Sequence, residues 1–254
     1  KEEDIMLKIL SEKQISKPKA VIFDTDNTLY RYDVAHSAAI SAVTKKAVNM
    51  LGISKKEFES AYKISRKNIK AQLGATASSH SRLLYFQRTI EHLGLRTRIL
   101  LTLDLEQTYW RTFLTNAQLF SHVKEFILDL KSSGIITANI TDLTAQIQFR
   151  KMVYFGLDEH FDYVVTSEES GKDKPDPKPF QIALDKLKIE PRKIWMIGDS
   201  ALEDIGGARK FGMTTIQKVH QNVKVGEGES KPDIVFNQYE SLLDFFHQSF
   251  SLRD

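Results

Sequence analysis

The chain has 254 residues, of which 41% are hydrophobic and 27% are charged, and its formal net charge is +3. This length and composition are typical of a globular protein with one large domain or two modest ones. The absence of cysteine excludes disulfides, thiolate nucleophiles and cysteine zinc sites, so a bound metal must have oxygen or imidazole ligands. The 36 basic and 33 acidic residues are too evenly balanced to predict a nucleic-acid partner.

The sequence also predicts no membrane partner. No apolar run reaches the roughly 18 to 20 residues that a membrane span needs. The first four residues, Lys1 to Asp4, are charged, whereas a secretory signal would need an apolar segment near the start. We therefore expect a cytoplasmic protein.

The elements predicted in chain order begin with an N-terminal extension, residues 1–18. It is polar, and we expect at most a short helix through its apolar positions, Ile5, Leu7, Ile9 and Leu10. Short apolar runs then recur along the chain, as expected for strands buried on both faces of a parallel sheet. They occupy residues 20–23, 135–140, 163–165, 194–197, 214–216 and 234–236. Segments of helical length, such as 179–187 and 202–211, separate the later runs, so the pattern predicts a doubly wound α/β domain.

The stretch between the first two strand runs is much longer than a simple crossover needs. It contains no strand run but several amphipathic helical patterns, at residues 39–51, 55–73, 82–93 and 103–113. We interpret this stretch as an inserted all-helical cap. The predicted organisation is an α/β core of residues 19–33 and 117–254, interrupted by a cap of residues 34–116.

Polar residues follow four of the strand runs, and in open α/β sheets ligands bind at the carboxyl ends of the strands. The first run is followed by a segment with two acids, the second by Thr-Asp, the third, after a loop, by a lysine, and the fourth by Gly-Asp. These residues are Asp24, Asp26, Thr141, Asp142, Lys174, Asp199 and Asp204.

Acids from the first and fourth runs would converge if these strands are neighbours in the sheet. Repulsion between the carboxylates is costly unless a cation lies among them, and an all-oxygen ligand set favours Mg²⁺. Any one of these acids alone could equally be a helix cap or a turn residue. The four places together indicate a site.

The ordered set resembles the four motifs of the haloacid dehalogenase superfamily, specifically its phosphatase branch. Residues 24–28 match the DxDxT signature, Thr141 matches the Ser/Thr of the second motif, and Lys174 matches the lysine of the third. Gly198, Asp199 and Asp204 match the GDxxxxD motif. The resemblance covers the chain from Ala20 to Met213. It implies a Rossmann-like core with a helical cap between the first two motifs, as in the subfamily of phosphoglycolate phosphatases and nucleotidases.

The resemblance also implies a mechanism. Asp24 would attack phosphorus to form an aspartyl-phosphate, and Asp26 would protonate the leaving alkoxide and then activate water. Mg²⁺ would be bound by Asp24, Asp26 through its main-chain carbonyl, and Asp199, with Asp204 as a ligand or support.

The same resemblance implies how the phosphoryl group is held. Thr141 and Lys174 would bind its oxygens, and the turn that contains Thr25 and Asn27 would supply main-chain N–H groups. Asp142, in the place after the second-motif threonine, departs from the neutral residue common in the family. An acid there should weaken phosphate binding unless it points away or pairs with a cation. For Asn139, inside the second strand, we favour a buried hydrogen bond over a substrate contact.

The sequence argues against several other functions. An EF-hand at Asp24 is excluded because its sixth position is Leu29 and its twelfth is Ala35. Dehalogenases of this family lack the second acid, so Asp26 favours phosphate chemistry. A phosphosugar mutase remains an alternative, because an aspartyl-phosphate can transfer its phosphoryl group to a sugar. A dehalogenase-like hydrolase of the same fold and a catalytically silent regulatory or binding protein also remain alternatives.

The substrate is expected to be a small phosphate ester, because a cap that closes over the site would shape a small cavity. Candidate cap contacts are His36, Arg66, Lys67 and Arg82, each of which alone is more commonly a surface residue. The chain itself is expected to be a monomer or a homodimer.

Overall fold

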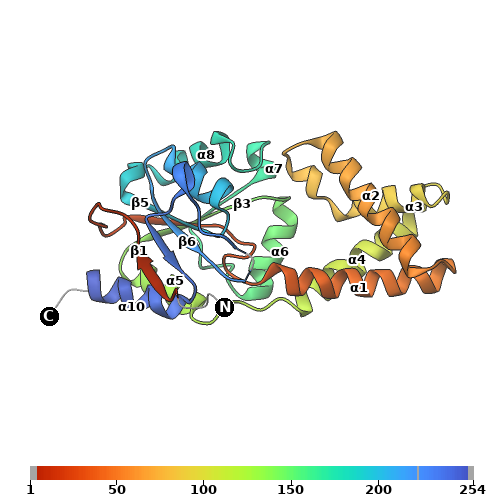
Figure 1. Cartoon of the computed structure of the whole chain (residues 1–254), viewed down its shortest axis with the longest axis horizontal. Coiled ribbons are helices and arrows are strands. Elements are labelled where there is room, and N and C mark those ends of the chain that lie inside the picture. Colours follow the sequence, from red (N-terminus) through yellow and green to blue (C-terminus); the bar gives the residue numbers. More distant parts are fainter. Residues whose placement is uncertain (1–4, 222, 251–254) are drawn as a thin grey trace. The chain divides into compact units, whose positions relative to one another are not determined.

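The computed structural model describes residues 5–221 and 223–250. Its chain divides into two compact units, one formed by the segments up to Tyr30 and from Leu119 onward, the other by Arg31–Gln118. Figure 1 shows the first as a sheet with flanking helices and the second as a group of helices, α1 to α4, coloured orange to yellow-green. We call them the α/β unit and the helical unit. The predicted cap, 34–116, falls within the helical unit.

The α/β unit contains one seven-stranded sheet, with strand order β1-β7-β6-β5-β2-β3-β4. All neighbouring pairs are parallel except β1 with β7. The strands are β1 (Leu7–Ile9), β2 (Ala20–Phe23), β3 (Ile136–Thr141), β4 (Tyr163–Thr166), β5 (Ile194–Gly198), β6 (Thr214–Lys218) and β7 (Ile234–Phe236). The six predicted strand runs and the predicted fold class, a doubly wound α/β domain, are confirmed.

The central strand β2 is fully buried because its side chains alternate between two apolar layers. Ala20 and Ile22 belong to a cluster that includes Phe180 of helix α8 (Pro177–Leu187). On the other face, the ring of Phe23 lies 6.2 Å from that of Phe126 in helix α5 (Val123–Ser132). Helix α10 (Tyr239–Phe250) lies beside α5 on this side, and α8 covers the opposite side (Figure 1). Strand β2 is therefore packed on both faces, and Asp24 follows its carboxyl end.

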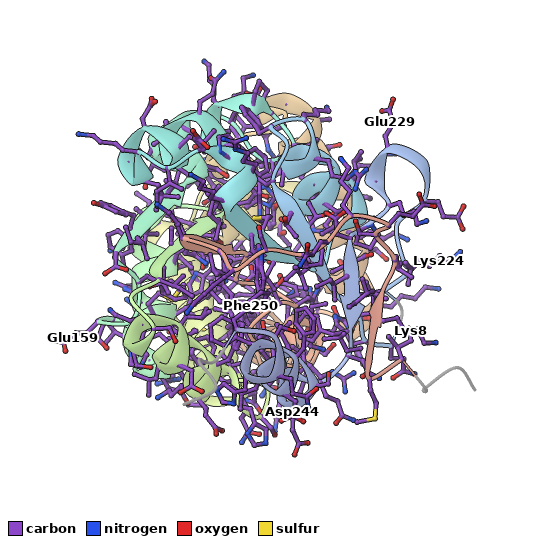
Figure 2. All side chains as sticks on the ribbon, turned by 90° about the vertical axis from the view of Figure 1, so that its left-hand side faces the viewer. Lys8, Glu159, Lys224, Glu229, Asp244 and Phe250 are labelled. Carbon is purple, nitrogen blue, oxygen red and sulfur yellow. The ribbon has the colours of Figure 1, made fainter. Side chains whose placement is uncertain are left out.

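Among the described residues, the α/β unit contains six further helical elements. They are α6 (Ala145–Phe155), α7 (Ser167–Ser170), the 3₁₀ turns η2 (Pro191–Lys193) and η4 (Gly228–Ser230), the π-helical segment η3 (Ala201–Gly206) and α9 (Gly207–Arg209). Charged side chains such as Lys8, Glu159, Lys224, Glu229 and Asp244 point outward from the unit (Figure 2).

The short helix predicted in residues 1–18 is wrong. Leu7–Ile9 forms β1, an edge strand antiparallel to β7, with Leu7 opposite Phe236. The apolar residues Ile5, Leu7 and Ile9 recur at every second position, which is the period of a strand and not of a helix. The extension therefore completes one edge of the sheet. Its first four residues lie outside the part of the chain that the structure describes.

The helical unit consists of α1 (Tyr32–Leu51), α2 (Lys55–Leu73), the 3₁₀ turn η1 (Ala77–His80), α3 (Arg82–His92) and α4 (Ile99–Thr115). Helix α1 is capped by Gly52, whose N–H donates to the carbonyl of Val48 and whose φ of 66° turns the following chain out of the helix. Helix α2 begins two residues later with a capping pattern, in which the Ser54 hydroxyl accepts from the N–H of Glu57. The two helices are thus separated by a compact turn.

The packed faces of the helical unit are rich in aromatic residues. Helix α1 packs against α4, and α2 packs against α3. The ring of Tyr109 in α4 lies 6.1 Å from Phe86 in α3 and 5.9 Å from Phe113. Within the described residues, no helix combines the length and apolar character needed to cross a membrane.

Candidate active site

The nucleophile predicted from the sequence, Asp24, lies directly beyond the end of β2. Its N–H donates to the carbonyl of Ile197 in the neighbouring strand β5, at 2.9 Å, so the sheet ladder continues into the site. The carboxylate accepts from the hydroxyl of Thr28 at 3.0 Å and from Nζ of Lys174 at 2.6 Å. Asp24 is 7% exposed, and burial, the strongest influence, raises the pKa of its carboxyl.

Lys174 connects the first and fourth motifs. Its Nζ donates to Asp24 and to Oδ1 of Asp204, both at 2.6 Å, and to the carbonyl of Ile140 at 3.1 Å. Burial alone would lower the pKa of this ammonium, but the two carboxylates outweigh it and raise the pKa of Lys174 well above its usual value. The lysine therefore remains a cation inside the protein.

The end of β5 brings the other two acids into place. Asp199 follows Gly198, and the π-helical segment η3 returns the chain so that Asp204 lies over the same glycine. A Cβ on Gly198 would lie 2.3 Å from Oδ2 of Asp204, so only glycine permits this approach. The same carboxylate accepts from the N–H of Ser200 at 3.0 Å, which fixes its orientation.

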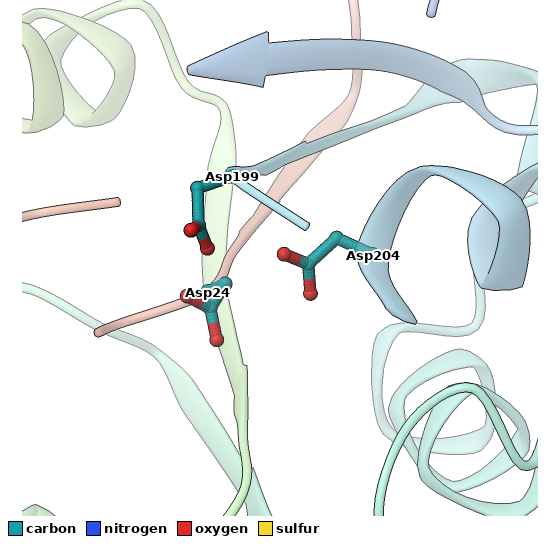
Figure 3. A group of neighbouring side chains, drawn as sticks. All are labelled: Asp24, Asp199 and Asp204. Carbon is teal, nitrogen blue, oxygen red and sulfur yellow. The ribbon is translucent and has the colours of Figure 1, made fainter. Parts of the chain in front are cut away.

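The carboxylates of Asp24, Asp199 and Asp204 form a cluster in which one oxygen of each lies within 4.8 Å of the others. They point toward one another from two strand ends and a helix (Figure 3). Burial and the neighbouring acids raise the pKa of Asp199 to about 9, and burial and Asp24 raise the pKa of Asp204 to about 7 despite Lys174. Such shifts mean that the ionised cluster lacks compensating positive charge.

The donor set fits a divalent cation. Three carboxylates and one ammonium, Lys174, carry a formal charge of −2 when all are ionised. All the candidate ligand atoms are oxygens, which suits Mg²⁺. The carboxylate of Asp26 is not part of this cluster, so its predicted role as a ligand would fall to its main-chain carbonyl, as the family resemblance implies.

The side chain of Asp26 is held by a residue that the sequence reasoning missed. Nζ of Lys151, in α6, donates to both carboxylate oxygens, at 2.7 and 3.0 Å, and the hydroxyl of Tyr30 donates to one of them. Lys151 is completely buried. Its position on the same helical face as Ile147 and Phe155, four residues to either side, was the available signal, because a lysine in an apolar stripe needs an acidic partner.

The second motif is organised by Gln148, another buried residue that was not predicted. Its amide Nε2 donates to the hydroxyl oxygen of Thr141 and to the carbonyl of Asp142, both at 2.7 Å. Thr141 thus accepts from the glutamine, while its own proton makes only a long contact, 3.5 Å, to the carbonyl of Asp142. The Asp142 carboxylate accepts from the hydroxyl of Ser167 at 2.9 Å and from the N–H of Lys174 at 3.0 Å, so it supports the third-motif loop.

In the turn of the first motif, Thr25 is fixed by a buried hydrogen bond, whereas Asn27 is distinguished by its backbone conformation. The hydroxyl of Thr25, fully buried, donates to Oδ1 of Asn139 at 3.1 Å, and Asn139 donates to the carbonyl of Phe23 at 2.9 Å. This is the buried hydrogen bonding favoured for Asn139 from the sequence. Asn27 has a φ of 63°, a left-handed conformation that turns the chain directly after Asp26. A substrate role for Thr25 would involve its main chain.

The candidate cap contacts all belong to the helical unit, but they differ in exposure. Arg66 and Lys67 of α2 are exposed, and His36 of α1 is partly buried. Arg82, the first residue of α3, is only 8% exposed, against the expectation of a surface residue.

Comparison with known proteins decides the family. Residues 21–218 match the family described as haloacid dehalogenase-like hydrolase. The chain belongs to this family. The match covers most of the chain and includes all four motifs, so the resemblance stated from the sequence is confirmed, and with it the hydrolase class.

Curated relatives and solved structures extend this comparison. The chain is 36% identical over 199 residues to a ribulose-1,5-bisphosphate 5-phosphatase of Halopiger xanaduensis, covering 78% of this chain and 83% of that protein. It is 26% identical to a glyceraldehyde 3-phosphate phosphatase of Methanocaldococcus jannaschii, covering 89% and 96% of the two chains. In structure it resembles a HAD phosphatase from Thermococcus onnurineus, with a TM-score of 0.66 and 24% identity over 90% of this chain and 97% of the other.

Proposed function

We propose that this chain is a Mg²⁺-dependent phosphatase that hydrolyses a small phosphate monoester through an aspartyl-phosphate on Asp24. The observation that carries this proposal is the cluster of Asp24, Asp199 and Asp204 around one point, with Lys174 bonded to two of the three. The predicted phosphatase branch of the family is confirmed by the curated relatives, which are named as phosphatases. The roles of individual residues are our proposal.

The reaction proceeds in two displacements. In the first, a carboxylate oxygen of Asp24 attacks phosphorus, the bond to the ester oxygen breaks, and Asp26 gives its proton to that oxygen, so the alcohol leaves. In the second, Asp26 removes a proton from water, the resulting hydroxide attacks phosphorus, and the bond to Asp24 breaks. Inorganic phosphate is released and both acids return to their starting states.

The remaining residues bind and orient the phosphoryl group. When bound among Asp24, Asp199, Asp204 and the carbonyl of Asp26, Mg²⁺ would neutralise negative charge on the phosphoryl oxygens. Lys174 keeps Asp24 in position and adds a buried positive charge beside it. The proton of the Thr141 hydroxyl is available to a phosphoryl oxygen because Gln148 already donates to that hydroxyl.

Energetics explains why so many groups are needed. Hydrolysis of a phosphate monoester requires an acceleration of up to about 10²¹-fold, whereas general acid–base catalysis contributes about 10²- to 10⁴-fold. Asp26 alone would therefore supply a small part. Phosphoryl transfer depends mainly on positioning and on electrostatic stabilisation, which the buried charges of this site can provide.

The substrate class follows from the relatives. Those named above act, by their names, on ribulose-1,5-bisphosphate and glyceraldehyde 3-phosphate, so a compact sugar phosphate is the substrate that we propose. A cytoplasmic location, the lack of a nucleic-acid partner and a monomeric or dimeric state stay predictions from the sequence.

The test is a screen of the purified protein against sugar phosphates, other metabolite phosphates and a phosphopeptide, with Mg²⁺ and after chelation. We expect Mg²⁺-dependent phosphate release that favours a sugar phosphate. Asp24→Asn should lower kcat by at least about 10³-fold because an amide cannot act as the nucleophile. The matched control is Asp185→Asn, an exposed aspartate of α8, which should retain wild-type activity.

Three results would contradict the proposal. Activity retained in Asp24→Asn would exclude this nucleophile, and full activity after exhaustive chelation would exclude the metal site. Conversion of a sugar phosphate into an isomer without phosphate release would identify a mutase instead.

A further inference from the structure

The helical unit contains a buried positive charge that the proposed chemistry does not use. Arg82 is 8% exposed, and its guanidinium donates to the carbonyl of His80 and to the hydroxyl of Tyr32. Its Cζ lies 5.2 Å from the ring centre of Tyr109 and 5.5 Å from that of Trp110. Within the described residues, no carboxylate forms an ion pair with Arg82. A buried cation with only neutral partners is costly unless an anion joins it.

Three buried polar atoms of α2 and α3, in the helical unit, have no hydrogen-bond partner. They are Nε of Arg82 itself, the hydroxyl of Tyr62 and the hydroxyl of Ser65. Tyr62 and Ser65 lie one turn apart on α2, so they share a helical face. The ring of Tyr62 lies 6.2 Å from that of Tyr85, and Cζ of Arg82 lies 5.5 Å from the same Tyr85 ring. Buried donors are normally satisfied, so this arrangement lacks an acceptor.

The surroundings of the cluster add positive charge. Arg66 follows Ser65 on α2. Burial raises the pKa of Tyr62 and Tyr85, and the positive charges of Arg82 and Arg66 partly oppose this rise. His36 bonds to the hydroxyl of Tyr109 at 2.7 Å. Burial, Arg82 and Arg66 lower the pKa of His36 to about 4, opposed only by Asp33. The histidine is thus neutral near pH 7, and the two arginines dominate.

We propose that the helical unit contains an anion-binding site formed by Arg82, Tyr62 and Ser65, with Arg66 at its edge, which takes an oxyanion such as a phosphate or carboxylate group. A phosphate or carboxylate offers several acceptor oxygens to the guanidinium and to both hydroxyls. The anion is either a second charged group of the substrate, in which case the inference rests on the proposed phosphatase activity, or a free oxyanion that acts as an effector.

The experiment compares matched esters that differ in one charged group. Ribulose 1,5-bisphosphate is paired with ribulose 5-phosphate, and 3-phosphoglycerate is paired with glycerol 3-phosphate. The ratio of kcat/KM within each pair is measured for wild type, Arg82→Gln, Tyr62→Phe and the control Arg88→Gln, an exposed arginine on the same helix. A second arm measures how sulfate changes hydrolysis of glycerol 3-phosphate by each protein.

If the anion belongs to the substrate, wild type prefers the doubly charged member of at least one pair. Arg82→Gln should then reduce that preference by about 10- to 100-fold, as expected for lost hydrogen bonds to a charged group, and Tyr62→Phe should reduce it less. Arg88→Gln should retain it. If the anion is free, sulfate should change the activity of wild type and Arg88→Gln, but not that of Arg82→Gln.

The inference is overturned if Arg82→Gln and Arg88→Gln show the same substrate ratios and the same sulfate response. If Arg82→Gln does not fold, Tyr62→Phe decides the question, since it removes a single hydroxyl. If wild type hydrolyses no ester at all, the proposed function fails separately. Calorimetric binding of sulfate to wild type and Tyr62→Phe then still tests the site.

Discussion

At the scale of single residues, the contact between Lys151 and Asp26 separates two tasks within the first motif. Asp24 is held by Lys174 and Thr28, whereas Asp26 is held by Lys151 and Tyr30. Each acid therefore has its own cation. We infer that Lys151 is a positioning residue, because it fixes the carboxyl that, in the proposed mechanism, protonates the leaving-group oxygen.

This role predicts the effect of Lys151→Met on different substrates. Without the ammonium, Asp26 loses its orientation, and kcat should fall by about 10- to 100-fold for a sugar phosphate, whose alkoxide needs a proton. The loss should be smaller for 4-nitrophenyl phosphate, whose phenolate leaves unprotonated, and Asp26→Asn should show the same selectivity. The control is Arg150→Met, an exposed neighbour on α6. Equal losses on both substrates would indicate that Lys151 only stabilises the fold.

His36 makes a prediction about pH. Its folded pKa is about 4, below the ordinary 6.5, because burial and then Arg82 disfavour its cation. Between these values the unfolded chain binds more protons than the folded one, so acidification from pH 6.5 to 4 removes stability, and above pH 6.5 the effect vanishes.

In His36→Gln, the loss of stability that protonation of His36 causes between pH 6.5 and 4 should disappear. Since the side chain is only partly buried, we expect a difference from wild type of about 1 to 2 kcal/mol across the window. Urea unfolding at several pH values measures it, with His92→Gln, an exposed histidine of α3, as control. Parallel pH profiles for wild type and His36→Gln would contradict the assignment.

At the scale of elements, apolar runs were sufficient to predict six strands because a strand buried on both faces tolerates few polar residues. Strand β1 escaped prediction because it is an edge strand with exposed residues and is only three residues long. The four helices of the helical unit were predicted from their periodicity. The start of α1 at Tyr32 was placed too late, since its first turns are less clearly amphipathic.

The site residues that belong to a sequence motif were predictable. Those that reach the site only through tertiary packing were not. The spacing of Asp199 and Asp204 was read from the sequence, but the π-helical segment that brings Asp204 over Gly198 has no simple periodic signature. Gln148 and Lys151 lie on a helix between two motifs, and their roles depend on which strand ends they face. Such contacts join residues far apart in the chain, so local patterns do not reveal them.

At the scale of the whole molecule, the charges are divided between the two units. The α/β unit contains a buried cluster with excess negative charge, and the helical unit contains a buried arginine without an acidic partner. Each unit therefore contains buried charge that is not neutralised within that unit. A divalent cation would supply the positive charge that the cluster of the α/β unit lacks, so its binding should stabilise the protein.

The pH dependence of Mg²⁺ stabilisation tests this for the α/β unit. The pKa of Asp199 is raised to about 9 and that of Asp204 to about 7 by burial and neighbouring acids. The metal-free folded protein therefore binds more protons than the unfolded chain between about pH 4 and 9, and its stability falls as pH rises through this range. Mg²⁺ competes with these protons, so its stabilising effect should grow with pH.

We expect Mg²⁺ at millimolar concentration to raise Tm more at pH 8.5 than at pH 6, measured by calorimetry. Asp199→Asn, which removes one ligand and one titrating group, should show a flatter pH dependence without Mg²⁺ and a much smaller response to Mg²⁺. Asp185→Asn should behave as wild type. An Mg²⁺ shift that is the same at both pH values, or that persists in Asp199→Asn, would mean that the cation binds elsewhere. Because the cluster lies wholly in the α/β unit, the shift should appear in the unfolding of that unit even if the helical unit unfolds separately.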